Sequence, residues 1–260
     1  MVHAVPDILA RIVETKRAEL AQLASQRGDL ERRAAARTGA RDFRAALAAR
    51  PPAIIAEVKK AWPSRGVFQA AYDPAGIAGA YAAGGAAALS VLTDRDYFQG
   101  ALADLEAARA AVPLPVLRKD FTLEDVHVLE AAAHGADAIL LIAAILAEDA
   151  MRRLRELAAR YGMAALVEVH DAGEIDAALG SGAEIVGVNN RNLHTFEVTL
   201  DTSMGLAEKI PAGVLKVAES GIHSRQDVAR LRGAGFDAFL VGEHLMQSPD
   251  AAEAVRALRA

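Results

Sequence analysis

One repeated pattern restricts the possible folds of this chain more than any other feature. Four times a helical stretch ends in glycine, a small or acidic pair follows, and an apolar run comes next. The copies are AAGGAAALSVL (82–92), AAHGADAILLI (132–142), LGSGAEIVGVN (179–189) and RGAGFDAFLVG (232–242). Glycine ends helices readily because it takes a positive φ without steric cost. Continuous apolar runs are typical of strands buried on both faces of a parallel sheet, so the repeat predicts alternating helices and parallel strands.

Apolar runs flanked by turn signals are predicted strands, and the chain has eight of them. They cover residues 53–59, 88–94, 115–121, 138–144, 164–170, 184–190, 215–221 and 238–244. The spacing leaves room for one helix in each gap. Eight strand–helix units in about 210 residues predict an α/β fold of the (β/α)8 TIM-barrel type. A doubly wound open sheet is the structural alternative.

Residues 1–50 precede the predicted strands and are expected to form a helical extension. Helical patterns cover residues 7–24 and, more briefly, residues 42–48. A segment of this size is too small to form its own domain, so we predict a single domain over residues 1–260, with the barrel in residues 51–260. The pattern alone leaves two roles open for the extension, which are covering one mouth of the barrel and simply stabilising it.

Several helix starts can be predicted from capping residues. Thr122, Asp171 and Ser224 each have an acidic residue three positions later, Asp201 is a further candidate, and Ser248 precedes a proline suited to the first helical position. All five predicted caps follow from the residue types at these positions.

Composition and charge exclude several classes of protein. The chain has no cysteine, which excludes a disulfide framework, thiolate metal sites and cysteine nucleophiles and fits a cytoplasmic location. A net charge of −5 disfavours nucleic acid and anionic membranes as partners. No signal peptide is expected at the start, and the apolar run at 138–147 is too short to span a bilayer.

Polar residues at the predicted strand ends are candidate site residues, because active sites of such barrels form at the C-terminal ends of the strands. Three of the six lysines lie there, in a chain with 23 arginines. Side chains alternate along a strand, so Glu57 shares a face with Lys59, and Glu168 shares one with His170. Burying unpaired charges is costly, so the pattern predicts a polar pocket of paired charges. The alternative is a set of structural ion pairs that closes the barrel.

The last two predicted strands indicate a phosphate site. Gly221 and Gly242 follow them, where backbone N–H groups can face an anion, and the corresponding loops often bind phosphate in barrels. A simple turn role for each glycine is the alternative. No metal is expected, because the seven histidines form no HxH or HxxxH pair. No Walker or Rossmann fingerprint is present, so no cofactor is predicted.

Seven segments together resemble one enzyme family. They are IIAEVKKAWPSRG (54–66), LSVLTDRDYFQG (89–100), VLRKDF (116–121), LVEVH (166–170), VGVNNRNL (186–193), VAESGI (217–222) and FLVGEHLM (239–246), and they are similar to indole-3-glycerol phosphate synthases. The resemblance covers nearly the whole chain, including the extension. It implies a carboxy-lyase of tryptophan biosynthesis that needs no cofactor or metal. Its substrate is 1-(2-carboxyphenylamino)-1-deoxyribulose 5-phosphate, which becomes indole-3-glycerol phosphate with loss of CO2 and water.

The resemblance also implies a role for each matched residue. Lys119 is the general acid of ring closure, Glu168 assists proton removal in dehydration, and Lys59 is a second cation for the phosphate or carboxylate and a candidate proton donor. Glu57 orients the lysines. The implied catalytic set is completed by Asn189 and Glu219. The implied substrate-binding residues are Ser64, Phe98, Phe121, Arg191, Leu193, Ser220 and Leu240. The implied phosphate-binding residues are Lys59, Ser220, Gly221, Gly242 and Glu243.

Two residues depart from the family pattern, in which serine is common at both positions: Trp62 and His244. A rival interpretation is another phosphate-binding barrel, such as a phosphoribosylanthranilate isomerase or ribulose-phosphate epimerase, but AEVKK, LRKDF and LVEVH together argue against it. A catalytically silent scaffold is a second rival, which the intact charged residues disfavour. The expected partner is a small phosphorylated molecule, with no nucleic acid or membrane, and the protein is expected to be a monomer or weak homo-oligomer.

Overall fold

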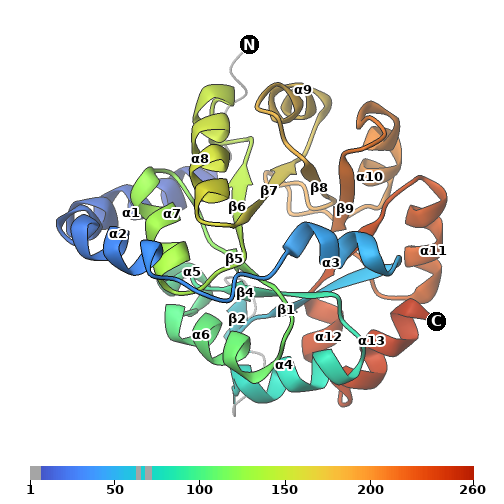
Figure 1. The fold of residues 1–260 in the computed structure, drawn as a ribbon. Coiled ribbons are helices and arrows are strands. Elements are labelled where there is room, and N and C mark those ends of the chain that lie inside the picture. The colour runs from blue at the N-terminus through green and yellow to red at the C-terminus, as the bar shows by residue number, and fades with distance from the viewer. Residues whose placement is uncertain (1–6, 63–65, 68–71) are drawn as a thin grey trace.

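The computed structural model describes residues 7–62, 66–67 and 72–260, and within them eight parallel strands form a closed barrel (Figure 1). The barrel strands are β1 (Ala53–Val58), β4 (Ala88–Leu92), β5 (Val116–Lys119), β6 (Ala138–Ile142), β7 (Ala164–Val169), β8 (Ile185–Asn189), β9 (Leu215–Glu219) and β10 (Ala238–Val241). Each pairs with its neighbours in chain order, and β1 closes the ring by pairing with both β4 and β10. The predicted (β/α)8 barrel is confirmed, and the open-sheet alternative is wrong because this sheet has no edge.

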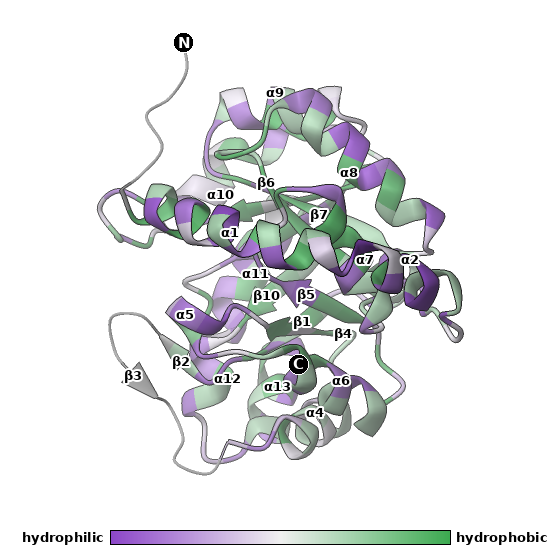
Figure 2. Cartoon of the chain, turned by 90° about the vertical axis from the view of Figure 1, so that its left-hand side faces the viewer, coloured by the Kyte–Doolittle hydropathy of each residue, from purple (hydrophilic) through white to green (hydrophobic). Residues whose placement is uncertain are grey.

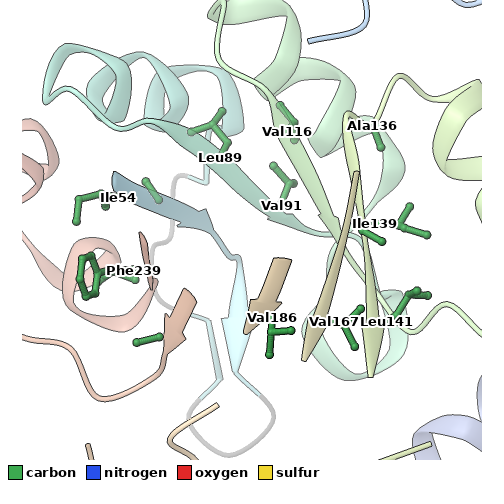
Figure 3. Close-up of a cluster of buried hydrophobic side chains, with 14 of the residues drawn as sticks. Ile54, Leu89, Val91, Val116, Ala136, Ile139, Leu141, Val167, Val186 and Phe239 are labelled. Carbon is green, nitrogen blue, oxygen red and sulfur yellow. The ribbon is translucent and has the colours of Figure 1, made fainter. Parts of the chain in front are cut away.

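Alternate residues of each strand belong to two different cores. The outward-facing side chains pack against the helices, and Figure 3 shows part of this layer, including Ile54, Leu89, Val167, Val186 and Phe239. The inward-facing side chains fill the barrel, among them Ile55, Leu117, Leu140, Leu166 and Val217. Both faces are buried, which explains why the strands lack polar alternation until their C-terminal ends.

Helices surround the barrel on the outside, where they cover the outer face of the strands (Figures 1 and 2). The helices of this layer are α4 (Pro74–Ala83), α6 (Leu102–Ala111), α7 (Asp125–Ala133), α8 (Glu148–Arg160), α9 (Ala172–Gly180), α10 (Asp201–Leu206) with the short η1 (Ala207–Lys209), α11 (Arg225–Gly233) and α13 (Ala251–Arg259). In α8 the buried residues Met151, Leu154 and Ala158 recur at helical spacing. No helix in the described part of the chain is long and apolar enough to cross a membrane.

Smaller elements lie at the C-terminal ends of the strands. They are α5 (Arg95–Phe98), α12 (Glu243–Gln247) and a two-stranded antiparallel sheet of β2 (Ala61–Trp62) and β3 (Gly66–Val67). The sequence pattern did not predict the small sheet, because two-residue strands carry no detectable period.

The N-terminal extension contains α1 (Asp7–Ser25), α2 (Arg27–Ala35) and α3 (Phe43–Ala49), of which α2 was not predicted. Helix α3 lies across the N-terminal end of the barrel, where Phe43 and Leu47 are buried in the same core as Ala53 of β1 (Figure 1). Helix α1 lies at the opposite end, on the same side as α5 in Figure 2. The extension therefore covers both ends of the barrel.

Two of the predicted helix caps are confirmed and three are wrong. Asp171 and Ser224 accept the backbone N–H groups three residues later. Helix α7 begins after Glu124 instead of Thr122, because the His127 ring accepts the N–H groups of residues 123 and 124 and organises the turn there. Helix α10 begins at Asp201, after Leu200. Helix α13 is capped by Asp250, and Ser248 bonds to that residue's backbone in the preceding turn.

Candidate active site

A cavity of about 650 Å³ opens at the C-terminal ends of the barrel strands. Its walls include every predicted site residue that the structure describes. These residues are Glu57, Lys59, Phe98, Lys119, Phe121, Glu168, Asn189, Arg191, Leu193, Glu219, Ser220, Gly221, Leu240, Gly242 and Glu243. Ser64 and the side chain of Trp62 lie outside what the structure describes. Residues predicted from seven separate segments of sequence thus face one space.

The polar side chains converge because they continue the inward-facing positions of their strands. The residues Glu57, Lys119, Glu168 and Glu219 each lie two positions after an inward-facing apolar residue, as Lys119 follows Leu117 and Glu168 follows Leu166. Closure of the barrel then points all these positions at the same axis. The apolar layer below them, with Leu140 and Leu240 at its upper edge, keeps water out of the barrel interior.

Lys119 is the centre of the charged cluster. Its Nζ lies 2.9 Å from Glu168 Oε2 and 3.8 Å from Glu219 Oε2. Burial alone would lower the pKa of Lys119, but the nearby charges of Glu168, Glu219 and Glu57 outweigh burial and raise it above the usual value. The ammonium group therefore stays protonated at neutral pH in the absence of ligand.

Glu168 is held as a charged carboxylate by three neighbours. Besides Lys119, the Asn189 side chain donates to Oε1 at 3.1 Å, and His170 Nε2 lies 3.4 Å from the same oxygen. Burial would raise the pKa of Glu168, but Lys119 and His170 outweigh it and lower that pKa well below the usual range. His170 in turn pairs with Glu174 at 3.1 Å. Although burial opposes it, bonding to the two carboxylates raises the pKa of His170 to about 10.

The pKa of Glu219 is shifted in the opposite direction to that of the neighbouring Glu168. Glu219 Oε1 is buried and has no hydrogen-bond partner among the described residues. Burial, followed by repulsion from the charge on Glu168, raises the pKa of Glu219 to about 8 despite the attraction of Lys119. Space for this carboxyl group comes from Gly187 on β8, because a Cβ at that position would collide with Glu219 Oε1.

Glu57 and Lys59 form a second ion pair on the other side of the cavity. Lys59 Nζ donates to Glu57 Oε1 at 2.5 Å, and both residues are buried. Tyr81 donates to the backbone oxygen of Glu57 at 3.1 Å and fixes the end of β1. A Cβ at Gly242 would collide with the Glu57 carboxylate, so this glycine makes room for the pair.

One wall of the cavity is apolar and aromatic. The rings of Phe98 and Phe121 lie 6.5 Å apart, centre to centre, at an interplanar angle of 31°. Helix α1 completes this wall with Ile8, Leu9 and Ile12. A planar aromatic ligand can be buried there against side chains that need no hydrogen bonds.

The ends of β9 and β10 expose backbone groups to the cavity. Ser220 and Gly221 both take a positive φ, of 67° and 76°, a conformation that is costly for serine. The buried Asn190 side chain holds this turn by donating to the Ser220 carbonyl at 3.1 Å. Nearby, the rings of His223 and His244 meet edge to face with centroids 6.2 Å apart.

The predicted site did not include His170 and Asn190, which contact residues of the cavity wall, or the α1 residues that line the cavity. His170 was detectable, because it shares the inward face with Glu168. Asn190 was not, because its role depends on a turn 30 residues later in the chain. The α1 residues were not detectable either, since nothing in a helical pattern shows which distant element it covers. In the described part of the chain, no three His, Asp or Glu side chains are grouped closely enough to hold a metal ion.

Comparisons with known proteins identify the family of this chain. The family model for indole-3-glycerol phosphate synthase matches residues 9–258. The synthase of Aromatoleum aromaticum is 51% identical over 258 residues, covering 97% of this chain and 98% of that protein. The synthase of Albidiferax ferrireducens is 50% identical over 250 residues, covering 94% and 95%.

Solved structures with low sequence identity share the barrel alone. 3-Hexulose-6-phosphate synthase matches with a TM-score of 0.64 at 15% identity, over 80% of this chain and 98% of that chain. The sequence relationship is far more specific than this likeness of fold. Because the match runs through the extension and all eight strands, the chain belongs to the indole-3-glycerol phosphate synthase family.

Proposed function

We propose that the chain catalyses the reaction of its family with the charged cluster around Lys119 as the reacting centre. The substrate is 1-(2-carboxyphenylamino)-1-deoxyribulose 5-phosphate, and the products are indole-3-glycerol phosphate, CO2 and water. The observation that carries the assignment of residues is the contact of Lys119 with two carboxylates, Glu168 and Glu219. Their pKa values are shifted in opposite directions, down for Glu168 and up for Glu219. A buried ammonium between such carboxylates can both stabilise a developing oxyanion and give it a proton.

The cavity offers separate places for the two ends of this substrate. The aromatic ring is proposed to bind against Phe98 and Phe121, and the phosphate is proposed to bind the backbone N–H groups near Gly221, Gly242 and Glu243. Anion binding by backbone N–H groups at these strand ends is common in barrels. Lys59 lines the same cavity and supplies a positive charge.

Ring closure is proposed to use Lys119. The aromatic carbon that bears the carboxylate forms a bond to the ketone carbon, and the ketone oxygen takes the proton of Lys119. The bond to the carboxylate then breaks, CO2 leaves, and its electron pair restores the aromatic ring. Lys119 regains its proton from solvent after dehydration, which balances the single proton that decarboxylation consumes.

Dehydration is proposed to use Glu168 and Lys59. The new hydroxyl leaves as water after taking a proton from Lys59, and Glu168 accepts a proton from the carbon beside the nitrogen. Asn189 and His170 keep Glu168 charged until then. Because the pKa of Glu168 is low, its bond to Lys119 must weaken before it becomes an effective base. Transfer of the Lys119 proton in the first step would have that effect.

The direct test is turnover of the carboxyphenylamino substrate by the purified chain, followed by indole fluorescence and by CO2 release. One CO2 per indole is expected. Absence of turnover by folded protein would contradict the function. We also expect a cytoplasmic enzyme, since the substrate is a phosphorylated metabolite, and a monomer or weak homo-oligomer.

Gly242→Ala should lower kcat/KM on the order of 10²-fold, the effect of displacing a reacting group by about 1 Å. The new Cβ would collide with the Glu57 carboxylate and push it and Lys59 out of place. Gly205→Ala is the matched control, because a Cβ there meets nothing within 4 Å. Steady-state kinetics of both variants test this, and equal activities would show that Gly242 is a turn residue only.

The pH dependence of kcat/KM should report the ionisation of Glu219. Its raised pKa means that the carboxyl group is neutral below about pH 8. Above that pH a further negative charge faces an anionic substrate, so kcat/KM should fall, by about tenfold per pH unit for one proton. Glu219→Gln should remove this descending limb. A limb that persists unchanged in the variant would assign the ionisation to another group.

A further inference from the structure

A second set of buried charges lies beside the cavity, centred on Lys16 of α1. Lys16 Nζ lies 3.0 Å from Asp94 Oδ2 and 3.0 Å from Asp120 Oδ1, and Glu19 Oε2 is 3.3 Å away. Lys16, Asp94 and Asp120 are 5%, 0% and 4% exposed. Burial alone would lower the pKa of Lys16, but the charges of Asp120 and Asp94 outweigh it and raise that pKa. The extension is thus joined to the barrel by a buried cation.

Each of the two aspartates also holds one residue of the aromatic wall. Asp94 Oδ1 accepts the backbone N–H of Phe98 at 3.3 Å, together with that of Tyr97 at 2.8 Å. Asp120 Oδ1 accepts the backbone N–H of Phe121 at 2.8 Å. Lys16 therefore neutralises both carboxylates that fix the two rings.

The helix that carries Lys16 supplies the rest of the same wall. Ile12 lies one turn before Lys16 and Ile8 and Leu9 lie two turns before it, so they share a helix face. All three line the cavity. A second contact joins the same elements, because the Thr15 hydroxyl lies 3.1 Å from that of Tyr97 on α5.

We propose that Lys16 is a positioning residue for the aromatic end of the cavity. It touches no substrate atom in this role, and its charge holds α1, Phe98 and Phe121 in the one arrangement that receives the substrate ring. The proposal rests on the proposed function, which places the ring against this wall. Lys119 does not belong to the cluster around Lys16, because its ionic partners lie on β7 and β9.

The test compares Lys16→Met with Arg17→Met in the full chain. Arg17 is the next residue of α1 and is exposed, so the control removes the same charge from the same helix. KM and kcat are measured with the carboxyphenylamino substrate. Equilibrium Kd values are measured by calorimetry for anthranilate, which represents the ring, and for inorganic phosphate, which represents the other end.

Lys16→Met should raise KM and the Kd of anthranilate by about tenfold or more, the size expected when a binding wall is misplaced. The Kd of phosphate and kcat should change by less than about threefold, and Arg17→Met should resemble the wild type. Lys16→Arg should recover most of the anthranilate affinity, because a guanidinium group can bond both carboxylates.

If Lys16→Met does not fold, the double variant Lys16→Met/Asp94→Asn is used instead, because it removes a buried charge together with its partner while Asp120 keeps Arg118. An unchanged anthranilate Kd, or equal weakening of anthranilate and phosphate, overturns the proposal in either variant. Absence of wild-type turnover would defeat the proposed function, while the two Kd values would still decide the role of Lys16.

Discussion

Lys119→Met is expected to lower kcat by about 10²- to 10⁴-fold, the usual contribution of a general acid. Methionine keeps most of the apolar stem but can neither donate a proton nor carry a charge. Glu168 and Glu219 would also lose the cation that lies between them. Lys119→Arg separates the two effects, because arginine keeps the charge but does not give up its proton at any relevant pH.

The measurement is steady-state turnover together with calorimetric binding of the product. Lys209→Met serves as the matched control, because Lys209 is exposed and does not line the cavity. Product binding should persist in Lys119→Arg while turnover stays low. Turnover of Lys119→Met within about threefold of the control would rule out proton donation by this residue.

Glu168→Gln is expected to separate CO2 release from indole formation. Glutamine has nearly the same shape and can still bond Lys119 through its oxygen, but it cannot take the proton that dehydration removes. In a single turnover, about one CO2 per site should appear first, while indole fluorescence lags by about 10²-fold or more. The cyclised, decarboxylated intermediate should accumulate in that interval.

Rapid quenching with mass analysis would identify this intermediate. Glu184→Gln is the control, since Glu184 lies on the surface with 66% of its side chain exposed. If CO2 release and indole formation slow by the same factor, Glu168 acts before decarboxylation, and the assignment to dehydration is wrong.

The strands could be predicted from the sequence because burial on both faces leaves a strong local signal. Because side chains alternate along each strand, residues that are adjacent in the sequence could be assigned to opposite faces of the sheet. Lys119 points into the cavity, whereas Arg118 points outward and bonds Glu130 of α7. Closure of the barrel then brings the inward-facing residues at the strand ends to the same place. For Glu57, Lys59 and Glu168 the correct strand boundaries were therefore enough. Others, such as Phe98 and Leu193, were predicted only from the family resemblance.

What the sequence could not provide depends on contacts between distant segments. Lys16 has no local signal, since its partners Asp94 and Asp120 come from the ends of β4 and β5. The cap at Thr122 was wrong for a local reason, because the His127 ring accepts the N–H groups of residues 123 and 124 and the helix starts two residues later than predicted. The raised pKa of Glu219 depends on burial and then on the charge of Glu168, and only the assembled barrel brings both about.

The buried position of Lys16 affects how the protein matures during synthesis. The helix α1 leaves the ribosome before any strand, yet Asp120 follows Lys16 by 104 residues. At 5–20 residues per second, α1 waits roughly 5–20 s before its last ionic partner has been made. During that time the apolar residues Ile8, Leu9 and Ile12 have no barrel to cover. The nascent chain therefore exposes these apolar residues during synthesis, and α1 cannot complete its ionic contacts with the barrel before the ends of β4 and β5 have been made.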